Sequence, residues 1–170
     1  MNKNLLQNGD FDTGEFDPWE VHAFQGEASV IQHNRSVQAQ VLPGVNNGVV
    51  LLNRFNAQTG AFTLQIDASA PEAKYHQDPP NIDTHAILVL FITGYAKDGR
   101  PVQYDVGSWW LKPAQKSFKY SGVMLDGVVE AQIQVSFPSD PLRVKGPLYI
   151  DNVSYTLDPP EHVRETRWSQ

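Results

Sequence analysis

The sequence predicts an all-β domain in which antiparallel strands form a two-sheet sandwich or a barrel. Short runs rich in Val, Ile, Leu, Phe and Tyr alternate with runs of Gly, Pro, Asn and Asp, as strands alternate with turns. No segment shows the apolar stripe of about 3.6 residues per turn that marks an amphipathic helix. The 12 glycines and 12 prolines favour many turns, and 170 residues suffice for one well-buried domain.

Ten segments of the chain are expected to be strands. The last of them ends before Pro159 and Pro160, because proline donates no hydrogen bond to a strand ladder. We therefore expect a sandwich domain of residues 1–157 and a mobile tail of residues 158–170. The expected strands are Asn4–Gln7, Ala28–His33, Ser36–Leu42, Gly48–Asn53, Ala61–Asp67, His85–Tyr95, Pro101–Leu111, Ser117–Met124, Val129–Phe137 and Pro147–Leu157.

Two Asp-Gly pairs between alternating runs predict tight hairpin turns, at Asp98-Gly99 and at Asp126-Gly127. The strand after the second turn is expected to have one buried and one solvent-facing side. Its buried side is expected to hold Val129, Ala131, Ile133 and Val135, and its wet side Glu130, Gln132, Gln134 and Ser136.

Charge and composition exclude several classes of partner. The formal net charge of -6 and the pI near 5.2 leave no basic stripe to neutralise phosphates, so nucleic acid is not an expected partner. The longest apolar run, Ala86–Ile92, falls far short of the roughly 20 residues that span a bilayer, so membrane insertion is not expected. The chain opens without a classical signal peptide, so we expect a soluble protein. It has no cysteine, so its cysteine usage does not indicate a redox compartment.

The stretch from Asp10 to Asp17 carries four carboxylates in eight residues. It lacks the ligand spacing of an EF-hand, and so wet a turn does not suit the raised pKa of a glycosidase acid. Solvated side chains in a polar turn explain Glu15 and Asp17. A second acidic group with histidines (His76, Asp78, Asp83 and His85) can bind a transition metal, but a polar loop explains it better. No pattern indicates a catalytic residue, so no enzyme is expected.

The strand at Pro101–Leu111 contains two adjacent tryptophans, which must point to opposite faces if the strand is regular. We expect one row to be buried and the other to form a ligand surface, where a sugar ring stacks on an indole beside amide and carboxylate groups. The alternative is a bulge at Gly107-Ser108 that buries Trp109, with the ligand then bound by the Ala68–Thr84 loop and Tyr75. The expected buried row is Val102, Tyr104, Val106 and Trp110, and the expected binding row is Gln103, Asp105, Gly107 and Trp109.

The two ends of the chain carry a more specific pattern. The opening "NLLQNGDFDTG" and the closing "GPLYIDNVSYTL" resemble the first and last strands of the carbohydrate-binding modules that accompany xylanases and cellulases. The order of the strands agrees along the whole chain, whereas the specific motifs occupy only its ends. The matching residues are Asn4, Leu5, Leu6, Asn8, Gly9 and Phe11 at the start, and Ile150, Asp151, Asn152, Val153 and Ser154 at the end.

The resemblance implies a galactose-binding-like jelly roll, a two-sheet antiparallel sandwich with Trp19 and Phe118 in its core. It also implies an extracellular setting and a structural calcium that joins the first strand to the last. The calcium ligands would be Asp12 and Asp151, followed by Asp10 and Asn152, with nearby backbone carbonyls. Asp12 departs from the pattern, because the family usually has a longer glutamate there.

The expected function is non-catalytic recognition of an oligo- or polysaccharide by one face of the sandwich. The alternative is a structural or assembly module that binds other protein chains, or further copies of itself, in a phage-like or secreted particle. The two differ in a measurable way, because only the first predicts retention by sugars.

Overall fold

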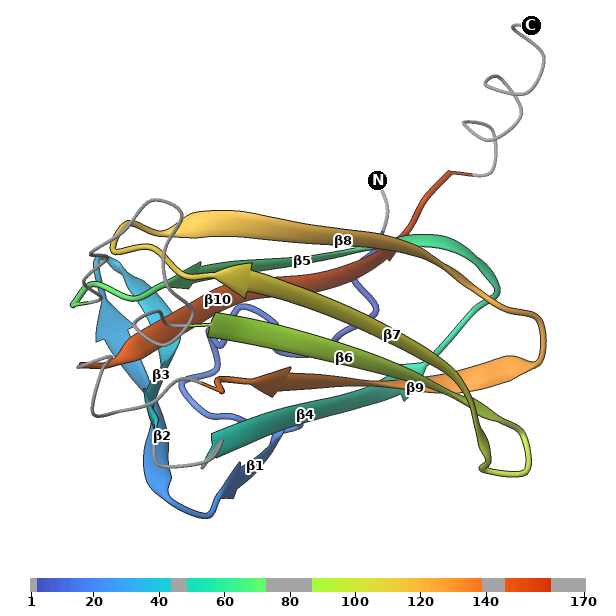
Figure 1. The fold of residues 1–170 in the computed structure, drawn as a ribbon, viewed down its shortest axis with the longest axis horizontal. Coiled ribbons are helices and arrows are strands. Elements are labelled where there is room, and N and C mark those ends of the chain that lie inside the picture. The colour runs from blue at the N-terminus through green and yellow to red at the C-terminus, as the bar shows by residue number, and fades with distance from the viewer. Residues whose placement is uncertain (1–2, 44–48, 73–86, 139–145, 160–170) are drawn as a thin grey trace, which may run out of the picture.

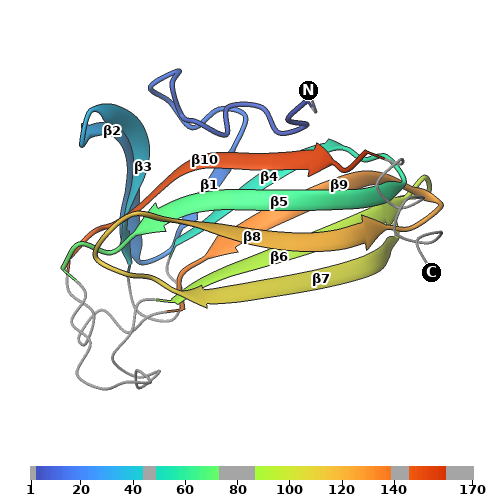
Figure 2. The ribbon, with the colours of Figure 1, turned by 90° about the horizontal axis from the view of Figure 1, so that it is seen from above.

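The computed structural model describes residues 3–43, 49–72, 87–138 and 146–159. Within these ranges the chain forms ten strands and no helix, and the strands pack as two antiparallel sheets (Figures 1 and 2). The predicted all-β sandwich is therefore confirmed. The strands are β1 (Glu20–Ala23), β2 (Gly26–His33), β3 (Ser36–Pro43), β4 (Val49–Asn56), β5 (Gly60–Ser69), β6 (Ile87–Ala96), β7 (Pro101–Trp110), β8 (Lys116–Met124), β9 (Val128–Ser136) and β10 (Leu148–Leu157).

One sheet has the strand order β1-β4-β9-β6-β7 and the other β2-β3-β10-β5-β8. We call them the β9 sheet and the β10 sheet after their central strands. Alternate residues of the central strands point between the sheets into one apolar core, as the period of two requires. The core side chains of β5, β6 and β9 are Phe62, Leu64, Ile66, Ala68, Leu88, Leu90, Ile92, Val128, Ala131, Ile133 and Val135.

The start of the chain differs from the expectation. Asn4–Gln7 is not a strand, and the additional strand is β1, which pairs with Val49–Leu52 of β4. The N-terminal segment, residues 3–19, instead runs beside the second half of β10 (Figure 2). The Leu5 N–H donates to the Tyr155 carbonyl at 2.9 Å, and the Val153 N–H donates to the Gly9 carbonyl at 2.8 Å. The two ends of the chain are therefore neighbours, but without a regular ladder.

Both Asp-Gly turns form. Gly99 has a φ of 86°, its N–H donates to the Ala96 carbonyl, and the Asp98 carboxylate accepts the Arg100 N–H. Strand β9 corrects two expected burials. Ser136, expected on the wet side, is buried, because it lies between Val50 of β4 and Val89 of β6. At the other end of the strand, Val129 is exposed and Val128 is buried. An irregularity in the pairing of β6 with β9, between Tyr95 and Ala96, shifts the start of β9 by one residue and exchanges the two valines.

The described chain ends just after β10, where the Asp158 N–H donates to the Ala61 carbonyl. The expected tail from residue 160 onward lies outside the described residues, as does the loop of residues 73–86 with Tyr75, His76, Asp78, Asp83 and His85. Among the residues described, no helix is long and apolar enough to cross a membrane.

Candidate functional site

Strand β7 alternates as expected, but its two faces are the reverse of the expectation. The row expected to be buried is exposed: the exposed fractions are 45% for Val102, 69% for Tyr104, 54% for Val106 and 41% for Trp110. The row expected to face solvent points inward, and Gln103 is only 9% exposed. Pairing with β6 is unbroken from Trp110 back to Gln103, so no bulge at Gly107-Ser108 causes this.

The polar inward row has a physical reason. β7 and β8 are the edge strands of the two sheets, and Gln103 joins them. Its Nε2 donates to the Val123 carbonyl at 2.8 Å, and its Oε1 accepts the Leu125 N–H at 2.9 Å. Asp105 accepts hydrogen bonds from Gln103 and, at 2.7 Å, from the Tyr120 hydroxyl. The bond to Asp105, with burial, raises the pKa of Tyr120 to about 12.

Trp109 completes this inward row. It is partly buried against the core, its ring lies over Gly107, and its centroid is 5.8 Å from that of Phe118 on β8. Three of the residues expected to bind a ligand (Trp109, Gln103 and Asp105) therefore hold the two sheets together at this edge. Any ligand role for them stays a prediction.

The outer face of the β9 sheet carries Tyr104 and Trp110, the exposed aromatic side chains that the sequence analysis expected to be buried, together with Phe91, for which it made no prediction. Phe91 of β6 is exposed and lies between Val106 of β7 and Gln134 of β9. One row along, Thr93 lies between Tyr104 and Gln132. The face thus has an apolar half on β6 and β7 and a polar half on β9 and the last residues of β4, Arg54 and Asn56. Because successive side chains of a strand point to opposite faces, the run "AILVLFI" already places Phe91 on the face opposite to Leu90 and Ile92.

The polar half contains one compact charged group. Arg54 of β4 forms an ion pair with Glu130 of β9, and its guanidinium lies 4.3 Å from the ring centroid of Tyr95 on β6. The side chain of Arg54 therefore crosses β9 on the outside of the sheet. Amides, a carboxylate and a guanidinium beside aromatic rings can hydrogen-bond hydroxyl groups while the rings contact C–H surfaces.

The outer face of the β10 sheet is different in character. Its central side chains are short and polar, and the ring of Tyr149 is stacked on His33 with a centroid separation of 3.7 Å. That face therefore offers mainly hydrogen bonds, and its exposed apolar side chains, Leu42 and Val123, lie on the separate strands β3 and β8. Its polar side chains include Thr63, Gln65, Asp67, Ser117, Ser121, Ser154 and Thr156.

The acidic stretch near the N-terminus forms the polar turn expected for Glu15 and Asp17. Asn8 holds it, since its Nδ2 donates to the Glu15 carbonyl at 2.8 Å and to the Asp17 carbonyl at 3.0 Å. The Asn8 carbonyl accepts the Trp19 indole N–H, and Trp19 is buried as expected.

The predicted calcium ligands come near one another but are partly occupied by other bonds. Asp151 is buried, and its Oδ1 accepts the Asn152 N–H at 2.8 Å. Burial raises the pKa of Asp151, and the nearby carboxylates of Asp12 and Asp67 raise it further. A cation would relieve this repulsion. The Asn152 side chain, however, donates to Asp67 at 2.9 Å.

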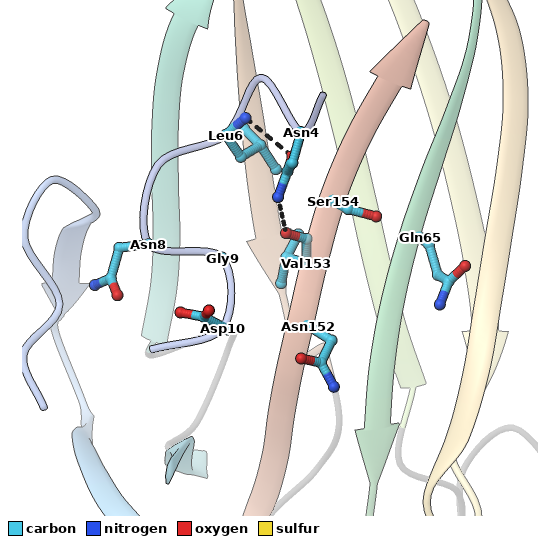
Figure 3. A pocket seen from close by; sticks show the side chains of 9 residues that line it. All are labelled: Asn4, Leu6, Asn8, Gly9, Asp10, Gln65, Asn152, Val153 and Ser154. Atoms are coloured by element: carbon cyan, nitrogen blue, oxygen red, sulfur yellow. Dashed lines mark hydrogen bonds between the residues drawn. The ribbon is translucent and has the colours of Figure 1, made fainter. Parts of the chain in front are cut away.

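The other two predicted ligands line a hollow of about 320 Å³ between the N-terminal segment and β10. Figure 3 shows Asp10 and Asn152 on either side of this hollow. Above them, the Asn4 side chain donates a hydrogen bond to the Val153 carbonyl and accepts one from the Leu6 N–H. Across the described ranges, no three His, Cys, Asp or Glu side chains gather as a metal-binding group. The donors thus fit calcium in charge but need carbonyl or amide oxygens to complete a coordination shell.

Solved structures show which proteins share this sandwich. TmCBM61, solved in complex with beta-1,4-galactotriose, matches with a TM-score of 0.64 and 14% identity over 92% of this chain and 99% of its own. The Clostridium thermocellum xylanase Xyn10B, solved as CBM22-1-GH10 modules with xylohexaose, matches with a TM-score of 0.69 and 9% identity. That match covers 94% of this chain and 29% of the xylanase chain.

A third similar structure is the enzymatically active domain of bacteriophage CBA120 tailspike protein 4, with a TM-score of 0.64 and 15% identity. The match covers 91% of this chain but only 21% of the tailspike chain. No protein-family model and no curated protein matches the sequence. At these identities the similarity establishes the fold: a β-sandwich shared with carbohydrate-binding modules.

Proposed function

We propose that this protein is a non-catalytic carbohydrate-binding module, and that the outer face of the β9 sheet binds the glycan. The observation that carries the proposal is the exposed apolar half of that face, above all Tyr104 and Trp110 on β7. The amides of Gln132 and Gln134 lie on the same face two strands away, on β9. Exposed aromatic rings beside hydrogen-bonding groups suit the two kinds of surface on a sugar ring. The sandwich shared with modules solved with galactotriose and xylohexaose supports it.

Isothermal titration against soluble xylan, β-1,4-galactan and a wider polysaccharide panel tests the proposal. Tyr104→Ala and Trp110→Ala should each weaken binding up to about tenfold, because an aromatic contact contributes roughly 0.5 to 1.5 kcal/mol beyond its area. Val123→Ala is the matched control and should bind like the wild type, because Val123 lies on the other sheet and its exposed fraction is between those of Tyr104 and Trp110. Binding to none of the polysaccharides, or equal binding by all variants, contradicts the proposal.

A structural or assembly role is the second candidate. It is favoured by the position of β7, an edge strand of ten residues whose outward side chains are largely apolar, since such edges can pair with another chain. The sandwich shared with the tailspike domain is consistent with it. Solution mass from light scattering separates the two: an oligomer that binds no glycan and is broken by Val106→Lys supports assembly.

We also propose a calcium ion near Asp151, supported by the mutual repulsion of Asp151, Asp12 and Asp67. A cation that binds only the folded state raises stability by mass action, by about 2.7 kcal/mol at a hundredfold excess over its dissociation constant. Thermal melts in calcium and in EDTA should therefore differ for the wild type and coincide for Asp151→Ala. Identical wild-type melts in the two buffers exclude the ion.

A further inference from the structure

A second hollow lies beside the polar half of the outer face. Strand β1 pairs only with Val49–Leu52, so the last residues of β4 have no neighbouring strand on that side. The N-terminal segment approaches there and leaves a hollow of about 540 Å³ between itself and β4. This volume lies within the range of small-molecule sites. The lining includes Gln7, Arg54, Phe55, Asn56, Gln58 and Glu130.

The hollow is continuous with the proposed binding face. Arg54 and Glu130 belong to both, because they lie on the outer side of β4 and β9 and also line the hollow. In register, a row runs from Tyr104 on β7 through Thr93 and Gln132 to Arg54. Three strand spacings separate the ends of this row, which is about 14 Å. That distance exceeds one sugar ring, so a ligand that reaches both ends must be a chain of several.

The chemistry of the hollow suits a sugar residue. Its amides can each donate and accept hydrogen bonds, as the vicinal hydroxyls of a sugar require. The positive charge of Arg54 is balanced by its ion pair with Glu130, so the hollow does not carry an unpaired cation. The apolar half of the face, by contrast, supplies ring contacts with few hydrogen-bonding groups.

From this continuity we propose that the hollow beside β4 is a separate sugar subsite, which binds one end of a glycan whose other residues lie across β6 and β7. The inference rests on the proposed function and deepens it. The face provides stacking for any chain of suitable shape. The hollow provides the hydrogen bonds that select the sugar and fix the direction of the chain.

Titrations with xylo- and β-1,4-galacto-oligosaccharides of increasing length test this subsite. Wild-type affinity should rise with length until the chain spans face and hollow. The double variant Asn56→Ala with Gln58→Ala should lose that rise, so its affinity for the longest ligands should be about tenfold lower than that of the wild type, as expected for two hydrogen bonds. Its affinity for the shortest ligands should stay unchanged. Both residues are exposed, and a thermal melt checks that the variant is folded.

Tyr104→Ala distinguishes a failure of this subsite from a failure of the proposed function. If Tyr104→Ala weakens binding at every length while the double variant keeps the full rise, the hollow is not a subsite and the face still binds glycan. If the wild type binds neither series nor the polysaccharide panel, the proposed function fails and the subsite with it. Val123→Ala again serves as the control on the opposite sheet.

Discussion

The two sides of the sandwich are closed in different ways. On one side the N-terminal segment packs beside β4 and β10. It is held by backbone hydrogen bonds, by the two bonds of Asn4 to the β10 backbone, and by the Asn53 side chain of β4, which donates to the Gln7 carbonyl. On the other side, β7 and β8 are joined by the side chains of Gln103, Asp105 and Tyr120. We call these the N-terminal side and the β7–β8 side.

The comparison shows that a polar side chain indicates a solvent-facing position in one region of the molecule and an inward-facing position in the other. On the N-terminal side the polar residues belong to a local motif whose turns can be recognised in the sequence. On the β7–β8 side, polar residues point inward because the edges of two sheets leave backbone groups that need partners. The displaced apolar residues of β7 then form the surface that we propose binds glycan.

The largest expected effect is at Gly9, on the N-terminal side. A Cβ at this position would lie 1.9 Å from the Val153 carbonyl oxygen, so Gly9→Ala must push the segment away from β10. Overpacking against backbone predicts a loss of roughly 3 kcal/mol, measured by urea unfolding. Gly14→Ala is the matched control, because nothing lies within 4 Å of its Cβ and only its φ of 81° opposes the change. Equal losses would show that the segment is not held tightly on β10.

Next in size is the contrast between the adjacent tryptophans on the β7–β8 side. Trp109→Ala should lower stability by roughly 3 kcal/mol, because the indole is packed against the core. Trp110→Ala should cost less, since its side chain is partly exposed on the outer face. Thermal melts of the two variants test which of the two tryptophans points into the core. A larger loss for Trp110 would restore the orientation expected from the sequence.

A smaller effect is expected at Gln103. Gln103→Leu leaves the Val123 carbonyl and the Leu125 N–H without their partner, which predicts a loss of about 2 kcal/mol. Gln32→Leu, on the exposed side of β2, should change the free energy of unfolding little. If the two variants unfold at the same urea concentration, Gln103 does not join the sheets.

The smallest effect concerns pH near the N-terminal side. Because its pKa is raised in the fold, Asp151 keeps a proton there at pH values where the unfolded chain has released it. In calcium-free buffer, stability should therefore fall as pH rises from the ordinary pKa of 3.8 through the raised value, and level off above it. Asp151→Asn lacks this group, so the difference between the two melting curves should grow over that window. Parallel curves would contradict the raised pKa.

Much of the fold could be predicted from the sequence because its signals are local. Nine of the ten expected strands overlap observed ones, since runs such as Ala61–Asp67 alternate between turns. The two Asp-Gly turns follow from the φ that glycine allows. Strand β1 was missed because "EVHA" is short and mostly exposed, and it is a strand only because β4 offers a pairing edge.

The sequence by itself determined the fold class, the hairpins, and the motif that brings the chain's start beside its last strand. It also determined that Trp109 and Trp110 lie on opposite faces. Only the tertiary structure decided which of those faces points inward, because period-two alternation defines two sides of a strand and not what each side meets. The hollow beside β4 could not be predicted from the sequence either. It arises beyond the first residue of β1, where the N-terminal segment, rather than a strand, packs beside β4.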